Sequence, residues 1–236
     1  MISAPRGALL TALFLLVACT RSESPSDREL GPRSERPELL LLTSLPLAFG
    51  ESFSIEATGS PVLDALEQRY RVKAIPTVSG DALNGARLLL MAQPLAQPAD
   101  DLVALDRWVR EGGRLLLLAD PMLEWADARP LGDPTRPPPM FMDTGLLGHW
   151  GLRLDAPDQR GDREFELAGR TVTARSPGSL HGACALSKDG VVARCTIGKG
   201  EALIVADADF LDWTREAQGQ AGRAALLAAL DRLERR

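Results

Sequence analysis

Four largely apolar runs constrain the fold of this chain more than any other feature of its sequence. They are Leu39–Leu42, Arg87–Ala92, Arg114–Ala119 and Glu201–Ala206. Each run is shorter than a typical helix, and none alternates between apolar and polar residues as a strand with one solvated face does. We therefore expect four strands that are buried on both faces, which is typical of parallel sheets covered by helices.

The segments between and after these runs have the pattern of amphipathic helices. Apolar residues recur at helical spacing in Val62–Tyr70, and the preceding Ser60-Pro61 pair suits the start of a helix. A second apolar stripe lies within Leu102–Val109, and Gly112-Gly113 would end that helix. The leucines within Leu226–Leu233 form one face of a C-terminal helix.

The alternation of buried strands and amphipathic helices predicts the fold class. We expect an α/β domain with a Rossmann-like, mostly parallel sheet and helices on both of its faces. The period of the pattern changes to two in Glu164–Thr173 and again in Ala183–Ile197, and each segment has a glycine where a tight turn is needed. These segments predict an added β-hairpin region.

The first 18 residues have the pattern of a secretory signal peptide. One positive charge, Arg6, precedes the apolar run Ala8–Val17, which is too short to remain as a membrane span. The run ends in Leu16-Val17-Ala18-Cys19, which resembles a bacterial lipobox and implies cleavage before Cys19 and acylation of its thiol. The alternative is an ordinary signal peptide with Cys19 incidental. We favour the lipobox because a free thiol is unusual in an oxidising compartment.

These observations divide the chain into three expected segments. Residues 1–18 form a lipoprotein signal peptide, residues 19–37 a disordered tether and residues 38–236 a single α/β domain. The tether is rich in Ser, Glu, Arg, Asp and Pro, so it buries too little apolar surface to offset the entropy of ordering. The expected location is the bacterial cell envelope, with the domain lipid-anchored to a membrane and facing the periplasm or another extracytoplasmic space.

The charge of the chain bears on its partners. The formal net charge is −5, and it becomes −6 when residues 1–18 are removed, because Arg6 is their only charged side chain. Binding to nucleic acid requires clustered Lys and Arg residues for phosphate contacts, and an acidic chain does not supply them. We expect the membrane to be a partner and nucleic acid not to be one.

Three aspartates follow buried strands and are the best candidates for a binding site. Asp120 follows one run, and Asp207 and Asp209 follow another, so their carboxylates are expected to converge at the carboxyl edge of the sheet. Ser44 and Arg114 are weaker candidates for the same ligand crevice. Carboxylates at this position can hold a divalent cation, and no other cofactor is expected. The alternative, which we favour, is that the aspartates cap turns by accepting backbone N–H groups.

The sequence offers no good nucleophile. The strand end Ala92-Gln93-Pro94 offers no nucleophile. Ser176 and Ser179 lie near His181, but no Gly-x-Ser-x-Gly elbow is present, and serines in turns usually bind backbone. We favour a structural role for these serines.

Cys184 and Cys195 are expected to form a disulfide. If Asp189-Gly190 forms a two-residue turn, the register places Cys184 opposite Cys195. The oxidising compartment expected for an exported chain also favours the bond.

Three sequence motifs carry a resemblance to a known family. They are Trp108–Pro121, Gly198-Lys199-Gly200 and Asp207–Leu211. In this order they resemble the extracytoplasmic domain of gliding-motility-type auxiliary proteins of ABC transport systems, over roughly residues 39–230. That family is related in fold to the class I glutamine amidotransferase and flavodoxin-like group. An amidotransferase-type enzyme needs a cysteine after a central strand, and the corresponding strand end, Ala92-Gln93-Pro94, lacks it.

The resemblance implies a function for the chain. It points to a non-catalytic auxiliary or solute-recognition component that works beside an ABC permease and ATPase. The alternative is a hydrolase or transferase that uses Asp120, Asp207 and Asp209, with a divalent cation as a candidate ligand. We favour the non-enzymatic function.

The lipobox generates a testable prediction. Cys19→Ser removes the thiol that would be acylated, so we expect the exported variant to lose lipid labelling and to leave the membrane fraction. Metabolic labelling with a radioactive fatty acid and fractionation of cells measure both effects. Acylation that persists in the variant would contradict the lipobox.

Overall fold

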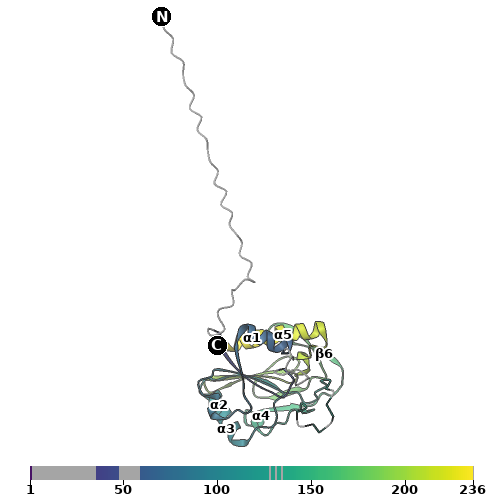
Figure 1. Ribbon diagram of the computed structural model, residues 1–236. Coiled ribbons are helices and arrows are strands. Elements are labelled where there is room, and N and C mark those ends of the chain that lie inside the picture. The colour runs from purple at the N-terminus through teal and green to yellow at the C-terminus, as the bar shows by residue number, and fades with distance from the viewer. Residues whose placement is uncertain (2–35, 48–58, 128, 131, 134, 236) are drawn as a thin grey trace. The chain divides into compact units, whose positions relative to one another are not determined.

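The computed structural model describes Met1, residues 36–47 and residues 59–235, apart from residues 128, 131 and 134 (Figure 1). Cys19, most of the expected tether and all of the expected signal peptide except Met1 lie outside the described residues. Among the helices that are described, none combines the length and the apolar character needed to cross a membrane.

A seven-stranded sheet forms the centre of the fold. Its strand order is β2-β1-β3-β4-β11-β10-β9. The first five strands in this order are parallel, and β10 and β9 continue the sheet in antiparallel pairing. The α/β class with a mostly parallel central sheet is therefore confirmed. The strands are β1 (Glu38–Thr43), β2 (Arg71–Ala74), β3 (Leu88–Ala92), β4 (Arg114–Leu118), β9 (Ala185–Leu186), β10 (Val192–Ile197) and β11 (Gly200–Val205).

Helices cover both faces of this sheet. Figure 1 shows α1 and α5 on one face and α2, α3 and α4 on the other. Alternate residues of each central strand enter two separate cores; in β1, Leu39 and Leu41 pack toward α1 and α5, while Leu40 and Leu42 pack toward the opposite helices. The helices are α1 (Pro61–Arg69), α2 (Gly80–Leu83), α3 (Ala99–Arg110), α4 (Leu146–His149) and α5 (Glu216–Glu234).

Local sequence signals explain where two of the elements begin. The Ser60 hydroxyl accepts the N–H of Leu63 at 3.0 Å, and Pro61 occupies the first helical position of α1. Gly200 begins β11 where its backbone meets the end of α3, since an added Cβ would lie 1.9 Å from the carbonyl oxygen of Val109. This close contact requires glycine and sets β11 against α3.

Two further antiparallel pairs lie between β4 and β9 along the chain. The first joins β5 (Leu152–Asp155) to β8 (Ser179–Gly182), and the second joins β6 (Asp162–Leu167) to β7 (Arg170–Arg175). Phe165 and Val172 of the second pair are buried in the core that contains α5.

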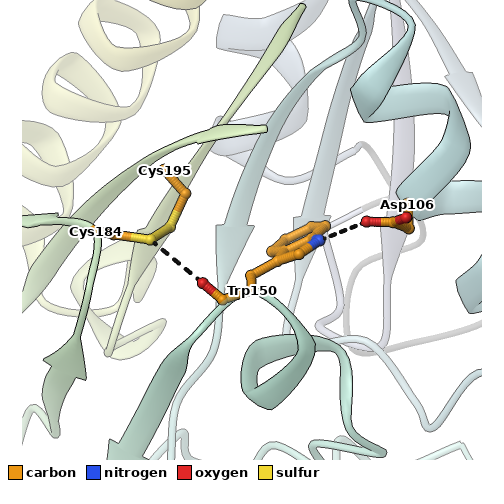
Figure 2. Close-up of a disulfide and its surroundings, with 4 residues drawn as sticks. All are labelled: Asp106, Trp150, Cys184 and Cys195. Carbon is orange, nitrogen blue, oxygen red and sulfur yellow. Dashed lines mark hydrogen bonds between the residues drawn. A yellow bond between two sulfur atoms is a disulfide. The ribbon is translucent and has the colours of Figure 1, made fainter. Parts of the chain in front are cut away.

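A disulfide joins Cys184 to Cys195, as predicted, with their Cα atoms 4.8 Å apart. The β9–β10 register is the expected one, since Arg194 lies opposite Ala185. Ser187 pairs with Val192, so the loop is wider than two residues. Figure 2 shows Trp150 between the disulfide and α3. Its carbonyl oxygen lies 3.8 Å from the Sγ of Cys184, and its indole N–H donates to Asp106 at 2.8 Å.

The disulfide generates a stability prediction. Replacing both cysteines with alanine should lower the free energy of unfolding by up to about 3 kcal/mol, because the bond closes a short loop in the unfolded chain. Urea denaturation of the oxidised protein and of the double variant measures the difference. Addition of reductant should destabilise only the parent protein, and equal stability with and without reductant would contradict the role of the bond.

Candidate functional site

Asp120, Asp207 and Asp209 meet at the carboxyl edge of the sheet. Asp120 lies two residues after β4 and Asp207 two residues after β11, the neighbouring parallel strand. Asp209 begins the short 3-10 helix η2 (Asp209–Leu211). One oxygen from each carboxylate lies within 4.8 Å of the others. We call these three residues the aspartate cluster.

The aspartate cluster is enclosed and does not line an open crevice. The exposed fractions are 0% for Asp120, 0% for Asp207 and 3% for Asp209. The large hollows described on the surface lie elsewhere; one of about 520 Å³ is lined by Trp108, Arg87 and their neighbours near α2 and α3. The cluster is therefore part of the interior of the domain.

The carboxylates bind backbone N–H groups of the loops that follow the strands. Asp120 accepts the N–H of Met122 at 2.8 Å through Oδ1 and that of Ala208 at 3.0 Å through Oδ2. Asp207 Oδ1 accepts the N–H of Phe210 at 2.9 Å. These bonds agree with the capping role that we favoured, since each one fixes a turn directly after a strand.

Asp209 joins the cluster to the long loop that follows β4. Its Oδ2 accepts the N–H of Glu124 at 2.8 Å. The Glu124 side chain accepts the Ser176 hydroxyl at 2.9 Å, and its charge acts on both Asp120 and Asp209. Sequence reasoning missed Glu124 because it lies in an irregular segment without a strand or helix pattern.

Burial raises the pKa of all three carboxyls, and the charges of neighbouring carboxylates add to this effect. Burial raises the pKa of Asp120 to about 6, against its bonds to backbone N–H groups. Burial and the charge of Asp120 raise the pKa of Asp209 to about 8. The pKa of Asp207 is raised well above its ordinary value by burial and by the charges of Asp120 and Asp209.

Two polar atoms near the cluster are buried without a hydrogen-bond partner. They are Oδ2 of Asp207 and Nη1 of Arg215. The charge of Arg215 lowers the pKa of Asp207, and its Nη2 donates to Asp162 at 2.6 Å. Burying an oxygen without a partner costs free energy, so Oδ2 of Asp207 needs a proton, a water or a cation as its partner.

Gln93 occupies the strand end where an amidotransferase-type nucleophile would stand. It has a φ of 44°, which is unusual for a residue with a side chain, and it is fully buried. Its amide accepts the N–H of Asp120 at 2.9 Å and donates to the carbonyls of Asp120 and Pro138, both at 3.1 Å. The amide is therefore fully occupied in joining β3 to the loop after β4.

The two weaker candidates occupy different ends of the sheet. Ser44 follows β1 at the carboxyl edge, where its hydroxyl donates to the carbonyl of Gln93. Arg114 is the first residue of β4, at the amino edge, where it donates to the carbonyl of Lys199 at 3.3 Å. The inclusion of Arg114 in the crevice was wrong, because a strand rises about 3.3 Å per residue and Asp120 lies six residues further along.

The serines near His181 do not form a catalytic triad. Ser179 and Asp155 both contact Nε2 of His181, at 3.3 Å and 3.4 Å. A triad needs the nucleophile and the acid on opposite ring nitrogens. The Ser176 hydroxyl donates to the side chain of Glu124 instead.

No protein-family model matches the chain, and no curated protein matches it.

Solved structures that resemble the chain support the fold alone. The exo-β-1,4-mannosidase Op5Man5 from Opitutaceae bacterium strain TAV5 has a TM-score of 0.50 at 15% identity, over 83% of this chain and 36% of that one. Gan42B, a GH42 β-galactosidase from G. stearothermophilus, has a TM-score of 0.50 at 14% identity, over 84% of this chain and 30% of that one. The N-terminal domain of mmIFT52 has a TM-score of 0.50 at 11% identity, over 83% of this chain and 97% of that one. The chain thus spans about a third of each glycosidase.

The raised pKa values predict how stability depends on pH in the absence of divalent cations. The folded protein holds protons on Asp120 and Asp209 up to about pH 6 and 8, whereas an unfolded aspartate releases its proton near 3.8. The free energy of unfolding should therefore fall as the pH rises from about 4 to 8. Thermal unfolding in a chelator should show the melting temperature (Tm) decreasing across this range.

Two variants identify the source of this trend. Asp209→Asn removes one titrating group, so the fall in Tm between pH 6 and 8 should become shallower. Asp143→Asn is the matched control, because Asp143 also accepts backbone N–H groups but is exposed. A Tm that rises between pH 5 and 8 in the parent protein would contradict the raised pKa values.

Proposed function

We propose that the protein is a lipid-anchored, non-catalytic auxiliary or solute-recognition component of an ABC transport system in the bacterial cell envelope. The anchor rests on the lipobox-like segment that ends in Cys19. The link to ABC transport rests on the three sequence motifs, of which Trp108–Pro121 forms the end of α3, β4 and the turn at Asp120. A permease or ATPase of that system is the proposed partner.

The observation that carries the non-catalytic part of the proposal is that buried polar side chains at the carboxyl edge of the sheet already bind backbone groups. Ligand and catalytic sites of open α/β sheets form beyond the carboxyl ends of the strands. At this edge the Gln93 amide is bound to backbone, and the Asp120, Asp207 and Asp209 carboxylates are buried. A catalytic group must reach a substrate, and these buried side chains cannot. They hold loops in place instead.

We further assign the domain to the Rossmann-like group, with flavodoxin-like topology. Numbered along the chain, the five parallel strands lie in the order 2-1-3-4-5, which is the flavodoxin-like order. The strand order reverses between β1 and β3, where ligands of such folds bind. The Thr43 and Ser44 hydroxyls donate to the carbonyls of Ala92 and Gln93 across this point. A recognised solute would bind beside Ser44.

The geometry supports a hydrolase less well. The alternative enzyme would use the aspartate cluster, but its side chains are at most 3% exposed. Two neighbours of similar fold carry glycosidase names, and glycoside hydrolysis needs two carboxylates on either side of an accessible sugar bond. The three carboxylates are enclosed in the interior, so a glycosidic bond cannot reach them.

Cross-linking in intact cells tests the proposed function. The full-length chain, cross-linked in its own membrane and isolated in detergent, should carry an ABC permease or ATPase that mass spectrometry identifies. The Cys19→Ser variant is the control and should lose this partner, because it leaves the membrane surface. Recovery of the anchored chain without either component would contradict the proposal, and so would a hydrolytic activity that Asp207→Asn abolishes.

A further inference from the structure

We propose that Asp120, Asp207 and Asp209 bind a hard divalent cation of the calcium class, which joins the loops after β4 and β11. The site is independent of the proposed transport function. Its role is structural, because the three carboxylates belong to loops that hold the carboxyl edge of the sheet together.

The spacing of the three oxygens fits such an ion. They lie within 4.8 Å of one another. Calcium binds oxygens at about 2.3–2.6 Å, so two of its ligands can lie up to about 5 Å apart. Magnesium binds oxygens at about 2.0–2.1 Å, so two of its ligands can lie only about 4.2 Å apart. Oxygens 4.8 Å apart would have to move closer together to bind it.

The unpartnered oxygen of Asp207 is a second and separate indication of a ligand. Asp207 is fully buried, its Oδ1 is bound by the N–H of Phe210, and its Oδ2 has no hydrogen-bond partner. One oxygen of Asp207 lies within 4.8 Å of an oxygen of each of the other two aspartates, so its carboxylate borders the space among them. A cation among the three would give this oxygen a partner.

The charge balance of the interior also favours a cation. Three ionised carboxylates carry a charge of −3, and burying them without compensation is costly. Arg215 contributes a positive charge, although its guanidinium also pairs with Asp162. A divalent cation would reduce the charge of the cluster to −1.

The loop that carries Glu124 is the side from which the cation would enter. The backbone N–H of Glu124 binds Asp209, while its side chain is 28% exposed. Its carboxylate is close enough for its charge to act on Asp120 and Asp209. Water ligands on this side would complete the coordination of the ion.

Titration with calcium alone tests the site. The full-length chain, purified in detergent and stripped with EDTA, should bind one Ca²⁺ per chain in calorimetry. Its Tm should rise by about 5–10 °C at a calcium concentration a hundredfold above the dissociation constant. Magnesium should give a smaller rise at the same concentration.

Two variants and one control keep the test decisive. Asp207→Asn should abolish both the heat of binding and the rise in Tm. If that variant does not fold, Asp209→Asn serves the same purpose, since the amide oxygen of asparagine can still accept the N–H of Glu124. Asp143→Asn, an exposed carboxylate that also caps backbone, should bind calcium like the parent.

Two results would overturn the proposal. The first is a Tm that neither Ca²⁺ nor EDTA changes, in which case shared protons hold the cluster together. The second is calcium binding that persists undiminished in both Asp207→Asn and Asp209→Asn, which would place the ion elsewhere. Neither result bears on the cross-linking test of the proposed function.

Discussion

The structure depends most on the way in which the Asp120 carboxylate joins the ends of two neighbouring strands. Its oxygens bind the N–H of Met122, in the loop after β4, and the N–H of Ala208, after β11. The backbone of the same residue is held by Gln93, after β3. Three adjacent strand ends are thereby connected through one residue. This arrangement brings Asp207 and Asp209 against Asp120, so the bonds that order the loops also concentrate negative charge in the interior.

Much of the fold could be predicted from the sequence, because its strongest signals are long or fully apolar. The four apolar runs became β1, β3, β4 and β11, and the disulfide followed from a register that the structure retains. The short elements α2 and β8 were missed, because four residues carry too little pattern to distinguish a helix or strand from a loop. The loop between β9 and β10 was expected to have two residues, and it is longer. Side-chain bonds that the backbone pattern does not show also shape it, such as the one that Asp189 accepts from the N–H of Val191.

The site was predicted in outline only. Strand order along the chain shows that Asp120, Asp207 and Asp209 follow buried strands, but it does not show that the strands are neighbours or that the side chains are enclosed. Arg114 was assigned to the wrong edge, although its position at the start of a strand already argues against it. Glu124 could not be found, because its place near the cluster depends on a long loop folding back over the sheet.

The central claim is that three carboxylates interact at one buried site and hold loops in place. Carbon-13 NMR of the aspartate carboxyl groups, followed from pH 3 to 9, tests it most directly. In the calcium-free protein the resonances of Asp120 and Asp209 should titrate near pH 6 and 8, and these titrations should disappear when calcium is present. Three independent titrations near the ordinary value of 3.8, unchanged by calcium, would contradict it.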